Sequence, residues 1–381
     1  MNSDPVYPVA RTVAPLVATH LALHRATVDG APSVATGSDS LLPDATVVGA
    51  LVDAAFWASL RREEGYVPTI SLAFLPPSAN VHPLTFARPL SLDPGGLARL
   101  GPAVERPGVH LGVWWNGDQL AVWGTTRTIP PFCFVVEVVA PGLIVLKHRP
   151  RQESQKFVNL AVIEGDTAKI IDESASLVPG CPAVLTGLLG LDATGQNRDA
   201  VQMLIQLAVS MRRHRRGGTL LIVPAATRSW EQSIVMPIAY AVQPAFAELA
   251  GLLNGASSED APDAGALRRA VTAVAGLTAV DGATILTDRY DLVAFGAKIR
   301  RKQGGAQVEQ LILTEPVVGN EPIRVTPGQL GGTRHLSAAQ FISDQREGLA
   351  LVASQDGRFT LFVWSLPEEL VHAHRVDTLL A

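Results

Sequence analysis

The second half of the chain alternates helical and extended apolar segments, and this alternation limits the fold more than any other feature. Apolar residues recur at helical spacing through 197–211 and 265–280. Each of these segments is followed by a short apolar stretch, TLLIVP at 219–224 and ATILT at 283–287. Such alternation is typical of layered domains in which helices flank a sheet. We therefore predict a C-terminal layered α/β domain with a mixed central sheet.

The first half carries stronger strand signals. LGVWWNGDQLAVWG, at 111–124, is typical of a hairpin, and its Asn-Gly pair suits a type I′ turn. An amphipathic helix is expected at 46–65, and two buried strands are expected within 132–146. The length of 381 residues favours two domains. We predict a mixed α+β domain over 1–216 and a layered α/β domain over 217–381.

Charge and composition exclude several classes of protein. The net charge is −4, so no overall basic field is present to attract nucleic acid or an anionic membrane. The most apolar window, 132–146, contains Glu137 and Pro141 and is too short to span a bilayer. Cys133 and Cys181 are far apart, and no signal peptide is evident, so we expect a cytoplasmic protein without disulfides.

Two short motifs carry chemistry. VDGAT places Asp281 between an apolar helix and a buried strand, where it is either a turn residue or a carboxylate for a divalent metal or a hydroxyl. GGTRH, at 331–335, precedes an Ala-rich helix. It is either a capped helix start with exposed Arg and His, or an anion site built from helix N–H groups, Arg334 and His335.

The order of these motifs resembles the diadenylate cyclase domain, in which Asp-Gly-Ala is followed by Gly-Thr-Arg-His-Arg, a helix and a strand ending in Ser. The matching positions are Asp281, Gly282, Ala283, Gly332, Thr333, Arg334, His335 and Ser354. The resemblance covers roughly 217–381. More loosely, LVDAAFWASLRREEG and GGTLLIVP are similar to DACNV, a sensor module that precedes such cyclase domains. The two resemblances imply a sensor domain over 1–216 and a nucleotide-binding domain over 217–381.

This resemblance implies an enzyme that condenses two ATP molecules into cyclic di-AMP with release of pyrophosphate. Two domains of a homo-oligomer would face each other, each holding one ATP. Asp281 would bind Mg²⁺ or Mn²⁺ and help to activate the ribose 3′-hydroxyl, while Arg334 and His335 would complete the catalytic set. The nucleotide-binding positions would be Gly282, Ala283, Gly296, Gly332, Thr333, Arg334, His335, Ser337 and Ser354.

The sequence departs from the family pattern in two places, which leaves alternatives open. Leu336 stands where the motif has its second arginine, and Gln355 stands where many members have glutamate, although Asp356 could substitute. Each missing charge-assisted hydrogen bond is worth about 1.5–3 kcal/mol. The alternative is a degenerate domain that binds ATP or a cyclic nucleotide without chemistry. A third option is an enzyme with another cyclic or linear adenylate product.

The remaining candidates favour structural readings. RRHRR, at 212–216, is predicted to be a solvated helix end, with an anionic signal or a partner subunit as the alternative. The tryptophans of the 111–124 hairpin are expected to be sheet core. The pairs His20/His24 and His372/His374 lack a third metal ligand nearby in the sequence, so we do not expect them to form metal sites.

Overall fold

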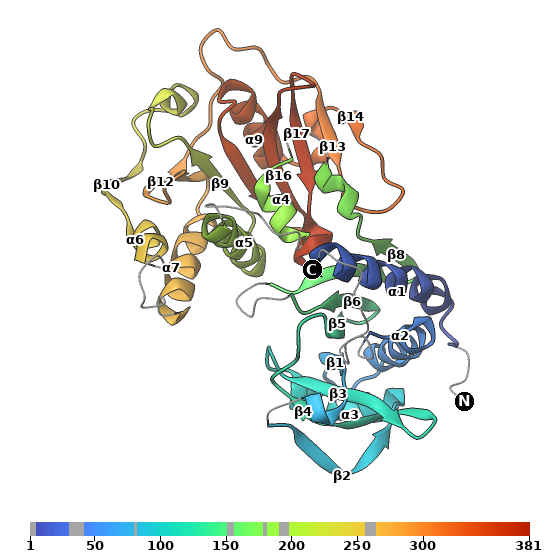
Figure 1. Cartoon of the computed structure of the whole chain (residues 1–381). Helices are drawn as coiled ribbons and strands as arrows, with labels where there is room; N and C mark the ends of the chain where they lie inside the picture. The colour runs from blue at the N-terminus through green and yellow to red at the C-terminus, as the bar shows by residue number, and fades with distance from the viewer. Residues whose placement is uncertain are drawn as a thin grey trace. The chain divides into compact units, whose positions relative to one another are not determined.

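The computed structural model describes residues 5–29, 42–79, 82–150, 156–177, 181–189, 198–255 and 264–381. The chain forms two compact units, one of residues 1–171 with Ala381 and the other of residues 172–380 (Figure 1). Each unit has its own mixed sheet, so the predicted mixed α/β fold class is confirmed.

The first unit contains three α-helices and eight strands within its described residues. In chain order these are α1 (Pro8–Asp29), α2 (Ala45–Ser59), β1 (Ile70–Phe74), β2 (Leu84–Ser91), α3 (Pro94–Val104), β3 (His110–Asn116), β4 (Gln119–Thr126), β5 (Phe134–Ala140), β6 (Leu143–His148), β7 (Val158–Glu164) and β8 (Thr167–Ile170), with a 3-10 turn at Pro77–Ala79. The strands form one sheet in the order β2-β4-β3-β1-β5-β6-β7-β8.

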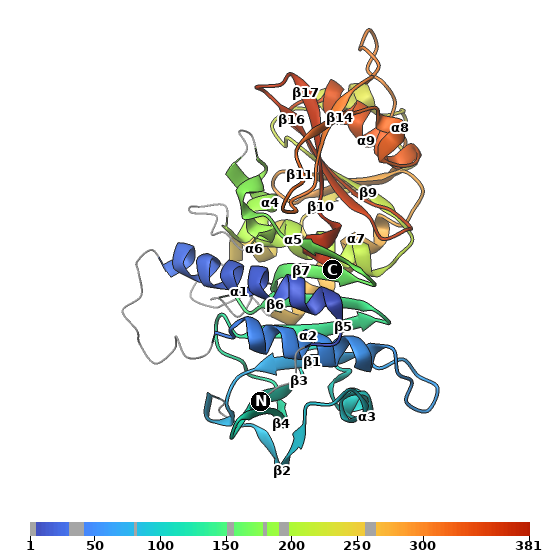
Figure 2. The same ribbon diagram turned by 90° about the vertical axis from the view of Figure 1, so that its right-hand side faces the viewer.

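The helices of the first unit pack on one face of its sheet. Alternate residues of β1, such as Leu72 and Phe74, join the main core with apolar residues of α1, α2 and α3. Figure 2 shows α1 and α2 lying side by side. The intervening residue Ala73 belongs to a second, smaller cluster with Trp123 and Cys133. Trp123 is thus part of the sheet core, as predicted, whereas Trp115 is 41% exposed.

The predicted hairpin is present, but its turn differs from the expected one. Asn116 pairs with Gln119, so the two turn residues are Gly117 and Asp118. Of these, only Gly117 has a positive φ, of 63°. A positive φ at the first turn residue alone is the pattern of a type II′ turn, whereas type I′ requires it at both positions.

The second unit contains six α-helices and nine strands within its described residues. In chain order these are α4 (Ala183–Leu188), α5 (Arg198–Arg213), β9 (Gly218–Val223), β10 (Tyr240–Phe246), α6 (Glu248–Gly255), α7 (Ala264–Leu277), β11 (Ala283–Thr287), β12 (Leu292–Ala297), β13 (Leu311–Thr314), β14 (Ile323–Val325), α8 (Pro327–Leu330), α9 (Thr333–Asp344), β15 (Leu349–Ala353), β16 (Phe359–Ser365) and β17 (Leu370–Arg375). Short 3-10 turns lie at Glu173–Leu177, Ser229–Ser233 and Asp377–Leu380.

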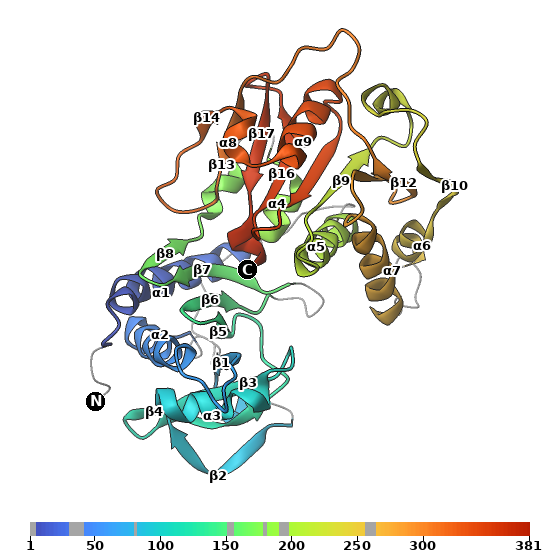
Figure 3. The same ribbon diagram turned by 180° about the vertical axis from the view of Figure 1, so that it is seen from behind.

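The sheet of the second unit is the middle layer of three. Its strand order is β10-β12-β11-β9-β15-β16-β17-β13-β14. All six residues of β9 are buried, because this strand lies between β11 and β15. Figures 1 and 3 show α8 and α9 on one face of the sheet and α4 and α5 on the other. On the first face, Phe341 and Ala338 of α9 pack against β9, β15 and β17.

The boundary between the units lies earlier than the predicted division at 216/217. The helix α5 precedes residue 217, yet it packs against α4, α7 and β15 of the second unit. Its apolar side, including Leu207 and Met211, is buried there. The helical spacing of α5 reveals an apolar face but does not reveal which sheet that face covers.

Candidate functional site

Four strands of the second sheet bring the sequence motifs to one end of the sheet. The strands β9 and β11 are parallel, with Thr219 opposite Ala283, so both begin there. Their antiparallel neighbours, β15 and β12, end there. The residues just beyond these four strands are Gly217, Gly282, Lys298 and Ser354. We call this group of strand ends, together with Asp281, the motif end.

Asp281 lies on an exposed turn at the motif end. The turn follows α7, and its side chain is 90% exposed. The Lys298 ammonium lies 2.5 Å from Asp281 Oδ2 and 3.3 Å from the Asp281 carbonyl oxygen. The hydrogen bond and charge of Lys298 lower the pKa of the Asp281 carboxyl, and the charge of Arg334 adds to the effect. Asp281 is therefore an ionised carboxylate facing solvent.

The backbone beside Asp281 requires glycine at two positions. Gly282 has a φ of +116°, and a Cβ there would lie 2.5 Å from the carbonyl carbon of Gly296. Gly296 has a φ of +61°, and a Cβ there would lie 2.7 Å from Cδ2 of Tyr240. The backbone segments at Gly282 and Gly296 are thus in direct contact, and the Tyr240 ring lies against Gly296. Tyr240 also stacks on Phe295, with ring centroids 4.9 Å apart.

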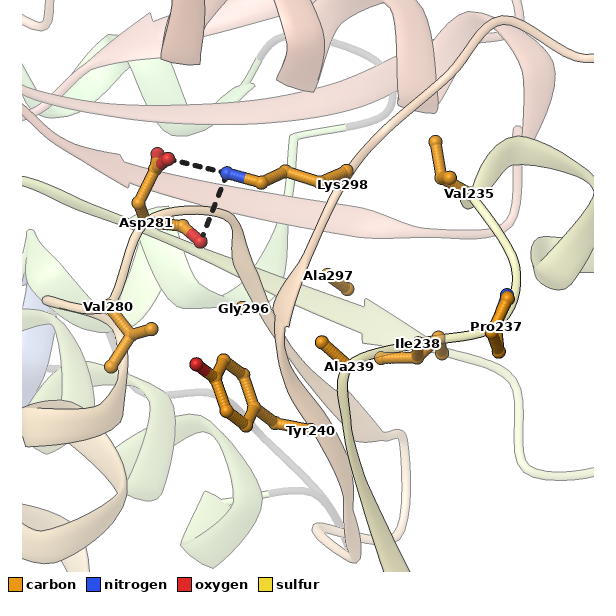
Figure 4. Close-up of a pocket in the computed structure, with 10 residues that line it drawn as sticks. All are labelled: Val235, Pro237, Ile238, Ala239, Tyr240, Val280, Asp281, Gly296, Ala297 and Lys298. Carbon is orange, nitrogen blue, oxygen red and sulfur yellow. Dashed lines mark hydrogen bonds and ion pairs between the residues drawn. The ribbon is translucent and has the colours of Figure 1, made fainter.

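A pocket of about 370 Å³ opens beside this contact. It is lined by Val235, Pro237, Ile238, Ala239, Tyr240, Val280, Asp281, Gly296, Ala297 and Lys298. Figure 4 shows Asp281 and Lys298 facing each other, with the Tyr240 ring and Val280 nearby. A mostly apolar lining with a few convergent polar groups is typical of small-molecule sites of this size.

The start of α9 reaches the motif end through Arg334. A Cβ placed on Gly217 would lie 2.9 Å from Arg334 Nη1 and 3.2 Å from the Ala353 carbonyl oxygen. The guanidinium therefore lies against Gly217, close to the end of β15. The N-cap of α9 is Gly332, which makes no side-chain capping hydrogen bond. The first N–H groups of a helix lack partners within the helix, so the exposed Thr333 and Gly332 leave this end open to an anion.

His335 does not face the open side of the motif end. Its side chain is 3% exposed, its Nε2 lies 3.4 Å from Thr360 Oγ1, and its ring packs edge-on against Phe362. Burial is the main reason that its pKa is lowered to about 4, so the imidazole is neutral at pH 7. In this buried position the His335 ring does not offer the contact with phosphate that the sequence led us to expect. The ring instead holds the first turn of α9 against β16.

The buried His335 makes stability depend on pH. Its folded-state pKa, about 4, lies below its ordinary value of 6.5, so the unfolded chain takes up the proton first as the pH falls. The free energy of unfolding should therefore decrease between pH 6.5 and 4, by up to about 1.4 kcal/mol per pH unit for this group. His335→Gln should make the urea midpoint of unfolding depend less on pH. His82→Gln, at an exposed position, should leave that dependence unchanged. Equal pH dependence in both variants would contradict the assignment.

The turn after β15 holds Ser354 near the same end. The Ser354 N–H donates to the Arg358 carbonyl at 2.8 Å. The Ser354 hydroxyl bonds to Asp356, and this is the main reason that the Asp356 pKa is lowered. Gln355 donates from Nε2 to the Arg216 carbonyl at 3.4 Å. Ser354 thus lies beside the candidate site. Ser337 is half-buried and lies about one turn after Arg334 in α9.

The basic segment 212–216 forms hydrogen bonds with other parts of the second unit, so it is more than a solvated helix end. His214 Nε2 lies 3.1 Å from Thr278 Oγ1, just before Asp281. The Arg216 carbonyl accepts the bond from Gln355, and Arg212 donates to the Asp377 carbonyl at 2.9 Å. The segment runs straight into β9, whose neighbours are β11, which follows Gly282, and β15, which ends just before Ser354. The prediction was a solvated helix end, with an anionic signal or a partner subunit as the alternative, and neither reading anticipated these contacts within the unit.

The donors at the motif end suit a metal that arrives with a nucleotide. Within the described residues, no group of three or more His, Cys, Asp and Glu side chains could hold a metal ion. Asp281 contributes a single ionised carboxylate. Mg²⁺ commonly binds one or two carboxylates and completes its shell with phosphate oxygens and water. Asp281 would be the protein ligand of such an ion.

Of the two histidine pairs, His24, His372 and His374 are buried and His20 is partly buried. The rings of His372 and His374 stack with centroids 3.9 Å apart, and Thr314 bonds to His372 at 2.6 Å. Burial lowers the pKa of His372 to about 4 and that of His374 to about 3. In the first unit, His24 is buried with its ring 4.7 Å from that of His148.

Comparisons with known proteins support the first unit most directly. A family model described as "Probable sensor domain DACNV" matches residues 38–127, which confirms the predicted DACNV-type module over that range. No curated protein matches the chain. Among solved structures, a double mutant of DacA from Staphylococcus aureus is similar, with 14% identity over 45% of this chain and 83% of that chain. The TM-score is 0.23, so the assignment of the second unit depends on its own residues. None of the helices in the described ranges is both long and apolar enough to cross a membrane.

Proposed function

We propose that the second unit is a nucleotidyltransferase of the diadenylate cyclase type, which condenses two ATP molecules into cyclic di-AMP and releases pyrophosphate. The observation that carries the proposal is the proximity of Asp281 and Arg334, which come from separate motifs. Arg334 lies against Gly217, just before β9, and Asp281 lies just before β11, the parallel neighbour of β9. A carboxylate and a guanidinium beside an open helix start are the groups that a metal–triphosphate requires.

The nucleoside and the phosphates of ATP would contact different parts of the site. Its apolar residues, such as Tyr240, Val280 and Ile238, offer a surface for the nucleoside. The groups that would bind the anion are Arg334, which lies against Gly217 just before β9, and the first N–H groups of α9. The triphosphate would lie along this side, with Thr333 and Ser354 as further donors.

Each half-reaction forms one phosphodiester bond. The 3′-hydroxyl oxygen of one ATP attacks the α-phosphorus of the other, and the bond from that phosphorus to pyrophosphate breaks. The hydroxyl proton leaves toward the Asp281 carboxylate or solvent, and Arg334 stabilises the charge that develops on the phosphoryl oxygens. When bound, Mg²⁺ or Mn²⁺ supplies Lewis-acid stabilisation of the same charge. A second attack in the opposite sense closes the ring.

Ring closure requires two nucleotides facing each other, so the active form would be a homo-oligomer with opposed second units. The first unit would act as the sensor that controls this enzyme, in the cytoplasm. The DACNV match over residues 38–127 supports this role. The composition gives no reason to expect a nucleic acid or membrane partner.

Two residues favour an alternative in which the unit binds ATP or a cyclic nucleotide without turnover. Leu336 is 42% exposed on the first turn of α9, where a second arginine would add a phosphate contact. The carboxamide of Gln355 is bonded to the Arg216 carbonyl, and an amide is a weaker metal ligand than a carboxylate. An enzyme with another adenylate product remains the third candidate.

Incubation of the full chain with ATP and Mn²⁺ or Mg²⁺ distinguishes these functions. We expect a cyclic dinucleotide, identified by mass spectrometry. Retained ATP binding without any adenylate product would favour the non-catalytic alternative, and a linear adenylate would favour the third. Absence of both binding and product would contradict all three.

A further inference from the structure

Lys298 is an unexplained feature of the candidate site. It is the first residue after β12, at the motif end. Among the ten residues that line the pocket, it is the cation and Asp281 is the anion. No motif of the sequence analysis includes it, because its position is defined by the contact of β12 with β11.

The ion pair of Lys298 with Asp281 is poorly suited to a structural role. The side chains are 55% and 90% exposed, respectively. Exposed pairs add little to stability, because water screens the attraction and both side chains lose freedom. Lys298 therefore contributes little to the stability of the fold. Its main effect at this position is on the electrostatics of the pocket.

The same carboxylate would be required by the metal. Lys298 Nζ lies 2.5 Å from Asp281 Oδ2, within direct hydrogen-bonding distance. An ammonium group and a divalent cation repel each other, so a metal ion on this carboxylate would weaken the ion pair with Lys298. When a metal–nucleotide binds this carboxylate, the weakened ion pair leaves the Lys298 ammonium free to turn toward a second anion, the phosphate chain bound to the same metal.

We propose that Lys298 is a phosphate-binding residue that exchanges the Asp281 carboxylate for a phosphate of the bound nucleotide. The inference rests on the proposed function and deepens it. It also accounts for Leu336, because Lys298 supplies from β12 a positive charge that the first turn of α9 lacks. The long, flexible lysine side chain can reach either anion by rotation.

The test compares nucleotide binding, measured by calorimetry on the full chain with Mn²⁺. Lys298→Gln should weaken ATP binding by at least about tenfold, the loss of one charge-assisted contact. Adenosine, which has no phosphate, should bind as it does to the wild type. Lys298→Arg should retain most of the ATP affinity. Arg301→Gln, which removes another exposed charge three residues away, should change the binding of neither ligand.

Titrations in EDTA test the exchange itself. Without metal, Lys298 is divided between Asp281 and the nucleotide, so Asp281→Asn should tighten ATP binding several-fold. The gain should shrink in the double variant with Lys298→Gln, since the released lysine is then missing. Equal gains in both backgrounds would show that the two residues act independently and would overturn the exchange.

The outcomes separate this inference from the function beneath it. Failure of the wild type to bind ATP overturns both. If the wild type binds ATP and Lys298→Gln binds it equally well, the inference is wrong and the proposed function stands. Equal losses for ATP and adenosine would mean that Lys298 only shapes the pocket, which also overturns the inference.

Discussion

Asp281→Asn should reduce formation of the cyclic dinucleotide by about 10²–10⁴-fold, the range of a positioned acid or base. The asparagine keeps the size of the side chain but removes the charge that would hold the metal and accept the hydroxyl proton. Because the carboxylate is 90% exposed, the fold should be unaffected. Product formation is measured by mass spectrometry and the fold by circular dichroism.

The matched control lies at the other end of the same strand. Asp288 follows β11 and accepts from the Ala225 N–H at 3.0 Å, a bond that asparagine can also accept. Asp288→Asn should therefore leave turnover near the wild-type level. Unchanged turnover in Asp281→Asn, or equal losses in both variants, would refute the role given to Asp281.

Gly282→Ala should destabilise the second unit by about 2–4 kcal/mol and abolish ATP binding. The positive φ of +116° is unfavourable for alanine, and the new Cβ would meet the Gly296 backbone at 2.5 Å. Relief of that clash requires β11 and β12 to separate, which moves Asp281 and Lys298 apart. Chemical denaturation and ATP calorimetry measure the two effects.

Gly276→Ala provides the comparison within the preceding helix. Gly276 lies in α7, and a Cβ there would have no atom within 4 Å. Alanine should therefore be neutral or stabilise by up to about 1 kcal/mol, because it favours the helix. If Gly282→Ala behaved like Gly276→Ala, the close approach of β11 and β12 could not be required for the site.

The local parts of the candidate site could be predicted from the sequence. The buried strand after Asp281 is present as β11, and a helix does begin after Gly332. These features follow from short-range signals, namely apolar runs, a polar turn and glycines. That helix runs from Thr333 to Asp344.

The nonlocal parts could not be predicted in this way. The segment before β9 meets Thr278 and Gln355 only because β9 lies between β11 and β15, and strand order is not encoded in any single window. Burial of His335 has the same origin, since it depends on Phe362 and Thr360 of a later strand. β17, which carries His372 and His374, was not predicted as a strand, and neither was the edge strand β2.

The account is tested most directly by the products that the full chain forms from ATP in the presence of Mn²⁺. We predict a cyclic dinucleotide with the mass of cyclic di-AMP, together with two pyrophosphates for each product molecule. Two phosphodiester bonds formed by two displacements fix that ratio. ATP that binds but is recovered intact, or a product that releases one pyrophosphate per dinucleotide, would contradict the proposal that the motif end closes the ring.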